Sequence, residues 1–129
     1  YFMKFKESGL KCGFFINKNL DHETENKILC NSKVTINIHD NYQRILGLDT
    51  NERTFKSLGL NGALVSDKVK QVERLLPFVK CVETPDEMVS QVREMIDDKN
   101  LNNYKKENKS FVMENHTYIN RVKELLNYE

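Results

Sequence analysis

The chain has 129 residues, of which 39% are hydrophobic and 30% charged, values that predict one folded domain over residues 1–129. A formal net charge of +1 gives the whole molecule no strong attraction to nucleic acid or anionic lipid, so neither is expected as a partner. No apolar stretch approaches the roughly 18–20 residues of a membrane span, and no secretory signal is visible. The chain begins with Tyr1, which favours a start inside a longer polypeptide.

The three cysteines, Cys12, Cys30 and Cys81, predict reduced thiols in the core of a cytoplasmic protein. Their number is odd and no two form a C-x-x-C pair. A zinc site would require closely spaced pairs, so we expect neither a metal nor another cofactor.

The first sixty residues alternate between helical and extended patterns. Val34, Ile36 and Ile38 alternate with polar residues, as in a half-buried strand. Asp21 is a suitable N-terminal cap for a helix, and Gly9 suits the end of one. The elements expected here are a helix over 1–8, a strand over about 12–16, a helix over 21–31, a strand over 34–38, a polar loop over 39–50 and a helix over 52–60.

The second half continues this alternation and ends in helices. The sequence T-P-D-E predicts a helix start, because Thr84 caps, Pro85 suits the first helical position and Glu87 completes a capping box. The further elements expected are a strand over 63–65, a helix over 69–76 ended by Pro77, a strand over 78–82, a helix after Thr84, a polar helix over 100–114 with a solvated lysine face, and a helix over 117–127 that buries Tyr118, Ile119, Val122, Leu125 and Leu126.

Strands that alternate with helices predict the α/β class, here a Rossmann-like, mainly parallel sheet of about four strands with a helical C-terminal end. Right-handed crossovers place the carboxyl ends of all the strands at one edge, where open α/β sheets bind their ligands. The polar residues that directly follow the expected strands are Asn17, His39, Asp40, Ser66, Asp67, Glu83 and Thr84.

The helix expected to begin near Asn51 provides a candidate anion site at this edge. Its first backbone N–H groups and its positive dipole end favour a phosphate, and Arg53 adds a guanidinium. Each residue also has an ordinary interpretation. His39 alone is equally a loop histidine, and Asp67 is equally a cap of the next helix. Arg53 alone is equally a member of a surface ion pair with Glu52 or a neighbouring acid.

Four stretches, KVTINIHD, NERTFKSLGLNGALVSD, VETPDEMVSQVREMIDD and ENHTYINRVKELL, together resemble the C-terminal domain of GT-B glycosyltransferases. The group 1 type related to spore-maturation proteins is the most similar. The resemblance covers about residues 10–128 and rests on the order and spacing of several weak motifs along the chain. They are Asn37-Ile38-His39, Arg53-Thr54-Phe55, Gly62, Asp67, His116-Thr117-Tyr118 and Arg121-Val122.

The resemblance implies the donor-binding half of a hexosyltransferase-type enzyme that binds a nucleotide-diphosphate sugar and needs no metal. The diphosphate is then expected at Glu52, Arg53, Thr54 and Phe55, mainly through their backbone. We expect the sugar or ribose at Asn37, Lys56 and Asp67, with His39 as the catalytic residue.

Two positions depart from the family pattern. The family has Glu directly after R-T-F, and this chain has Lys56 there. Many relatives carry a second Glu eight positions earlier, and this chain has Leu48 at that position. Lys56 then either binds a phosphate, or the chain is a non-catalytic Rossmann-like module that binds a nucleotide or a protein. At the other end, Thr117 is interpreted as a helix cap and His116 as a structural turn residue.

A GT-B enzyme has two Rossmann-like halves, and its acceptor binds to the N-terminal one. This chain supplies one sheet, so an N-terminal domain is an expected partner and transfer by this chain alone is not expected. The acceptor stays unknown. A homodimer through an exposed sheet edge is a further expectation.

Overall fold

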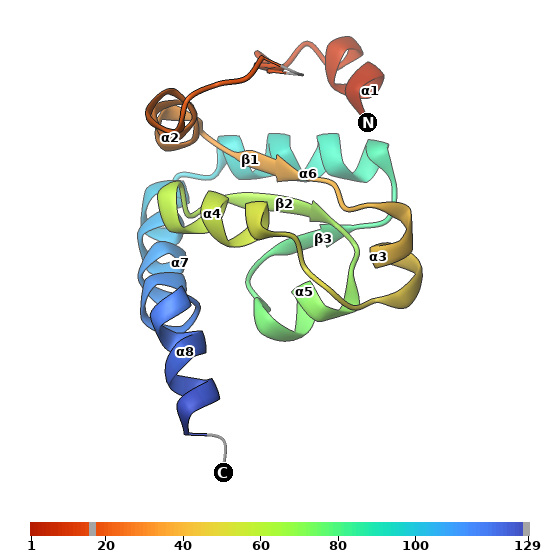
Figure 1. Ribbon diagram of the computed structural model, residues 1–129. Coiled ribbons are helices and arrows are strands. Elements are labelled where there is room, and N and C mark those ends of the chain that lie inside the picture. Colours follow the sequence, from red (N-terminus) through yellow and green to blue (C-terminus); the bar gives the residue numbers. More distant parts are fainter. Residues whose placement is uncertain (16–17, 128–129) are drawn as a thin grey trace.

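The computed structural model describes residues 1–15 and 18–127. Its elements follow one another along the chain in an α/β arrangement (Figure 1). They are α1 (Phe2–Glu7), α2 (His22–Asn31), β1 (Thr35–Asn37), α3 (Asn41–Leu46), α4 (Glu52–Leu60), β2 (Leu64–Asp67), α5 (Lys70–Leu75), β3 (Lys80–Val82), α6 (Pro85–Asp97), α7 (Leu101–Asn115) and α8 (Tyr118–Leu126).

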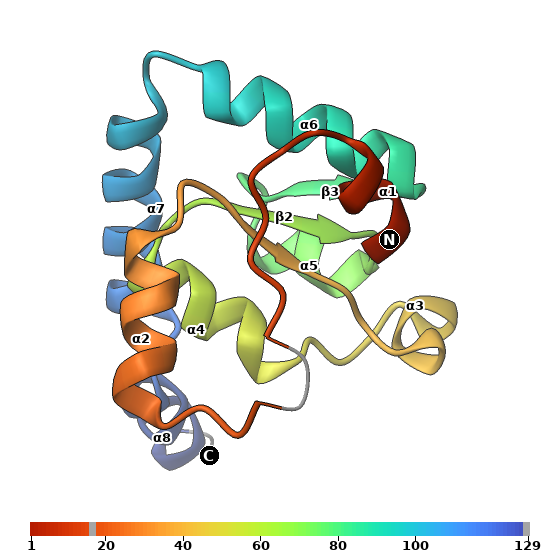
Figure 2. The ribbon, with the colours of Figure 1, turned by 90° about the horizontal axis from the view of Figure 1, so that it is seen from above.

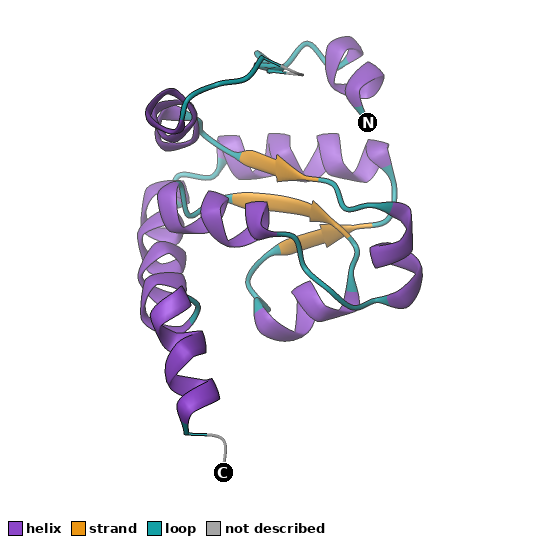
Figure 3. Cartoon of the chain, viewed as in Figure 1, coloured by secondary structure: helices purple, strands orange, loops and turns teal. Residues whose placement is uncertain are grey.

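The three strands form one parallel sheet in the order β1-β2-β3, as the alternating pattern predicts. Ile36 lies opposite Val65, and Ser66 lies opposite Cys81. The central strand β2 is buried along its whole length, which is typical of a strand covered on both faces. Figure 3 shows the strands enclosed between helices.

Two apolar cores cover the two faces of the sheet. Adjacent residues of β2 point to opposite faces, so Val65 joins one core and Leu64 the other. The first core packs Phe5 of α1 and Met88 of α6 against the sheet. The second packs residues of α4, α5 and α7, among them Leu58, Val72 and Val112.

The helix starts follow the signals in the sequence. Thr84 and Glu87 form the expected capping box at the start of α6, and Asp21 accepts a hydrogen bond from the Thr24 N–H at the start of α2. At the end of α1, Gly9 takes the left-handed conformation expected of a residue that follows a helix.

The expected strand over 12–16 is wrong for residues 12–15, which form a loop, while residue 16 lies outside the described part. The sheet therefore has three strands instead of about four. Leu10 and Phe14 pack onto the core, but Cys12, between them, and Phe15, after them, are exposed. Gly13 lies within this run, and a glycine inside a strand weakens it because it has no side chain to pack.

The polar loop expected over 39–50 contains a helix, α3. Asp40 and Gln43 form a capping box, and Gly47 ends the helix with a φ of 67°. These cap signals are present in the sequence. The helix lacks the buried apolar stripe that would have revealed it, because Ile45 and Leu46 are exposed.

The apolar face of the last helix is exposed, contrary to the expectation. Thr117 caps α8 as expected, and α8 extends away from the sheet beyond α7 (Figure 1). No residue of α8 is buried, and Tyr118, expected to pack, is 78% exposed. The helical spacing predicted an apolar stripe correctly, but spacing does not say whether a neighbour covers it.

Two of the expected core thiols are also at the surface: Cys12 and Cys30 are exposed, and Cys81 is half-buried. All three are free, as expected. The lysines of α7 largely face solvent, with Lys105 as the exception. It is partly buried, and its Nζ donates to the Ser32 carbonyl at 2.8 Å.

Candidate functional site

Helix α4 begins at the carboxyl edge of the sheet, beside the last residue of β1. Asn37 Nδ2 donates to Asn51 Oδ1 at 3.0 Å, and Asn51 Nδ2 donates to Asn37 Oδ1 at 3.2 Å. Asn51 is the N-cap of α4 and Asn37 ends β1. The turn that leads into Arg53 thus lies at the edge where the parallel strands end.

A buried pair of titratable side chains occupies the same edge. His39 Nδ1 lies 2.7 Å from Asp67 Oδ1, and both side chains are 0% exposed. The backbone N–H of His39 also donates to both oxygens of this carboxylate, at 3.1 Å each. Asp67 therefore fixes the position of the chain after β1, rather than capping α5 as the alternative interpretation held.

The pair continues into a chain of polar contacts that reaches α4. On the other side of the ring, His39 Nε2 lies 3.4 Å from Asn37 Nδ2. Asn37 Nδ2 also donates to Thr54 Oγ1 at 2.8 Å. The ends of β1 and β2 and the first turn of α4 are thus linked by side chains, among which Asn37, Thr54 and Asp67 are fully buried.

The first turn of α4 is partly occupied by the protein's own cap. Asn51 Oδ1 accepts from the Thr54 N–H at 3.2 Å, which takes the third amide of the helix. Glu52 and Arg53 precede it and are exposed. Since the first amides of a helix have no partner within the helix, those of Glu52 and Arg53 are the ones left for an anion. Among the described residues Arg53 takes part in no ion pair, so its alternative pairing with Glu52 is not observed.

Phe55 and Lys56 face away from this first turn. The Phe55 ring packs against His116, with ring centroids 5.5 Å apart, so its side chain belongs to the apolar core. Lys56 Nζ lies 2.5 Å from Glu25 Oε2 of α2. Lys56 stands where the family pattern has Glu, and its charge is paired here with Glu25 on the neighbouring helix α2.

Arg44 of α3 also lies at this edge, and the sequence analysis did not identify it as a site residue. Its Nε is 3.5 Å from Asp67 Oδ2, and its side chain is 38% exposed. Tyr1 lies near both groups: burial raises the pKa of its hydroxyl, the charge of Arg44 lowers it and that of Asp67 raises it. The cap signals around α3 indicate a helix, but nothing in the sequence pairs Arg44 with Asp67.

The other polar residues expected at this edge have structural partners. Asp40 caps α3 and Thr84 caps α6. Glu83 pairs with Lys68 at 2.7 Å, and this contact lowers the pKa of Glu83. Asn17 lies outside the described residues, and Ser66 is fully buried beside Asp67. Figure 2 shows α3 beside the ends of β1 and β2.

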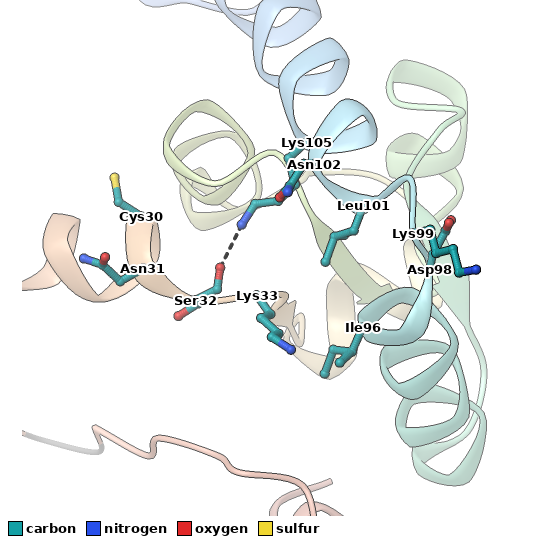
Figure 4. Close-up of a pocket in the computed structure, with 10 residues that line it drawn as sticks. All are labelled: Cys30, Asn31, Ser32, Lys33, Ile96, Asp98, Lys99, Leu101, Asn102 and Lys105. Carbon is teal, nitrogen blue, oxygen red and sulfur yellow. Dashed lines mark hydrogen bonds between the residues drawn. The ribbon is translucent and has the colours of Figure 1, made fainter.

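A cavity of about 410 Å³ lies at the opposite edge of the sheet, where β1 begins and α6 ends (Figure 4). Burial lowers the pKa of Lys105, which contacts Ser32 there. Lys33 and Lys99, which also line the cavity, extend in different directions in Figure 4. Its polar groups therefore do not converge on one ligand atom, and the carboxyl edge remains the better candidate.

Among residues 1–15 and 18–127, no three His, Cys, Asp or Glu side chains lie close enough together to hold a metal ion. In the same residues no helix has the length and apolar character needed to cross a bilayer. A family model described as glycosyl transferase-like matches residues 6–127. No curated protein and no solved structure matches the chain.

Proposed function

The chain belongs to the glycosyl transferase-like family, and we propose that it is the donor-binding half of a GT-B glycosyltransferase, of the group 1 type related to spore-maturation proteins. Its donor would be a nucleotide-diphosphate sugar. The observation that carries this proposal is the start of α4 at the carboxyl edge of a parallel sheet, in a chain whose family transfers sugars.

The diphosphate would bind at the first turn of α4. The free amides of Glu52 and Arg53 and the Arg53 guanidinium supply donors and positive charge there. As the glycosidic bond breaks, the diphosphate leaves with additional negative charge. Donors that are already in position stabilise that charge without a metal ion.

Asn37, His39 and Asp67 act in this proposal by holding the edge in shape, since their side chains are buried and bonded to one another. A catalytic role for His39 stays a prediction, because contact with a substrate requires its ring to become accessible. Lys56 contributes to the donor site only if its pairing with Glu25 is broken.

The acceptor would bind to a second domain, so we expect the described unit to bind a donor but not to transfer the sugar alone. We place the protein in the cytoplasm, where the thiols of Cys12, Cys30 and Cys81 stay reduced.

A second candidate function is a non-catalytic nucleotide-binding module. The observation that favours it is the loss of both family acids, with Leu48 exposed and Lys56 tied to Glu25. The two candidates differ in whether sugar is released from a bound donor once the acceptor-binding domain is present.

The test is calorimetric titration of the chain with UDP, GDP, ADP and CDP. We expect one of them to bind, and Arg53→Gln to weaken that binding about tenfold, the effect of losing a charge-assisted contact. Arg74→Gln is the matched control, because Arg74 is an exposed arginine of α5. Absence of binding to all four nucleotides would contradict the proposal, as would equal binding by the Arg53→Gln variant.

A further inference from the structure

The carboxyl edge carries a second arginine, Arg44, whose direction is set by a buried carboxylate. We infer that Arg44 is an anion-binding residue of this edge and that Asp67 orients its guanidinium toward the donor diphosphate. The inference rests on the proposed function and adds a residue from a different element, α3.

The first step is the charge of Asp67. Its side chain is 0% exposed, and a buried carboxylate is unfavourable unless hydrogen bonds and a positive charge compensate it. His39 supplies hydrogen bonds from its backbone and its ring. Among the described residues Arg44 is the only Lys or Arg within 4.0 Å of the carboxylate.

The second step is the geometry of the arginine. The contact with Asp67 uses Nε, at 3.5 Å, and the side chain remains 38% exposed. No described residue accepts a hydrogen bond from its Nη atoms. A guanidinium carries five N–H donors in one plane, so an ion pair through Nε leaves the outer donors to bind a phosphate in a forked arrangement.

The third step is the connection to α4. Asp67 contacts His39, whose Nε2 lies 3.4 Å from Asn37 Nδ2, and Asn37 bonds to Asn51 at the start of α4. Polar side chains thus connect Arg44 to Asn51, the N-cap of α4, and Arg53 follows Asn51 by two residues. The two arginines together supply two positive charges for a diphosphate, which carries at least two negative ones.

An alternative is that Arg44 does no more than neutralise Asp67. The two roles separate when affinity for a diphosphate is compared with affinity for the same nucleoside without phosphates. The test uses Arg44→Gln, Arg44→Lys and the control Arg74→Gln, each titrated with the nucleoside diphosphate that binds the unmodified chain, with its nucleoside and with inorganic pyrophosphate.

We expect Arg44→Gln to raise the Kd for the diphosphate and for pyrophosphate about tenfold, and to leave the Kd for the nucleoside unchanged. Arg44→Lys keeps a charge beside Asp67 and guards against loss of folding. It should bind the diphosphate more weakly than the unmodified chain, because an ammonium lacks the planar fork.

Three results would overturn the inference. If Arg53→Gln weakens diphosphate binding while both Arg44 variants bind normally, the proposed function stands and the role of Arg44 is wrong. If Arg44→Gln lowers the melting temperature but not the affinity, Arg44 only neutralises Asp67. If the unmodified chain binds neither a nucleoside diphosphate nor pyrophosphate, the role of Arg44 and the proposed function fail together.

Discussion

At the scale of single residues, the candidate site combines buried polar side chains that contact one another with the exposed Glu52 and Arg53 at the start of α4. The sequence identified Asn37, His39 and Asp67 as polar residues at strand ends. It did not show that they bond to one another, because contacts between residues 28 positions apart depend on the register of β1 and β2. The exposed Arg53 was the residue whose position the helix pattern predicted best.

The first prediction concerns the His39–Asp67 pair. Replacing His39 by Ala removes the ring that lies 2.7 Å from the buried Asp67 carboxylate and leaves Arg44 as the positive charge beside it, so we expect a loss of about 2–4 kcal/mol in the free energy of unfolding. Urea unfolding measures this loss. His22→Ala, at an exposed position of α2, is the control and should change stability by less than about 0.5 kcal/mol. Equal effects of the two substitutions would refute the role of the pair.

The second prediction concerns Gly62, which has a φ of +83°. A Cβ at this position would clash with the backbone carbonyl of Lys105 in α7. Gly62→Ala should therefore destabilise the fold by about 2–4 kcal/mol. Gly9 also has a positive φ, +75°, but open space around it, so Gly9→Ala should cost only about 1 kcal/mol. A Gly62 variant as stable as the Gly9 variant would show that α7 does not approach this closely.

The third prediction concerns pH and the thiol of Cys81. Burial raises its pKa to about 12, with Glu73 and Asp67 adding to the rise. The reactive thiolate is a fraction that falls about tenfold for each pH unit below the pKa, so at pH 8 to 9 the native thiol should alkylate at least about a hundredfold more slowly than in urea. The measurement uses iodoacetamide on the variant Cys12→Ser/Cys30→Ser. Equal rates in the native and unfolded chains would contradict this prediction.

At the scale of elements, cap signals were more informative than apolar spacing. Thr84, Thr117 and Asp21 cap the helices that the sequence assigned to them. Apolar spacing predicted the existence of α8 but gave the wrong environment for it, and it missed α3, whose apolar residues face solvent. Spacing reports which residues share a face of a helix, whereas burial depends on what the rest of the chain places beside that face.

The fourth prediction follows from the exposure of α8. Ile119 and Leu125 are 68% and 75% exposed, so replacing either by Gln should change the free energy of unfolding by less than about 0.5 kcal/mol. Leu58→Ala is the contrast: Leu58 lies on the buried face of α4, and its replacement should cost about 2–5 kcal/mol. A loss for the α8 variants comparable to that for Leu58→Ala would mean that this helix packs against the body of the chain.

At the scale of the whole molecule, the class of fold and the start of α4 at the carboxyl edge of the sheet were predictable, and the strand count was not. Alternating strands and helices predicted a parallel sheet and hence one carboxyl edge, and α4 begins there. Residues 12–15 of one expected strand form a loop, because a short apolar run pairs only if its backbone meets a partner strand. The sequence could not assign Arg44 to this edge, because its partner Asp67 lies on β2, more than 20 residues later in the chain.

The central claim is that a diphosphate binds at the first turn of α4. The most direct measurement is the change in backbone amide chemical shifts of an isotope-labelled chain as the binding nucleoside diphosphate is added. We predict the largest changes at Glu52 and Arg53, with smaller changes along α3. Changes concentrated instead around Ser32 and Lys105, at the cavity on the opposite edge of the sheet, would contradict the account.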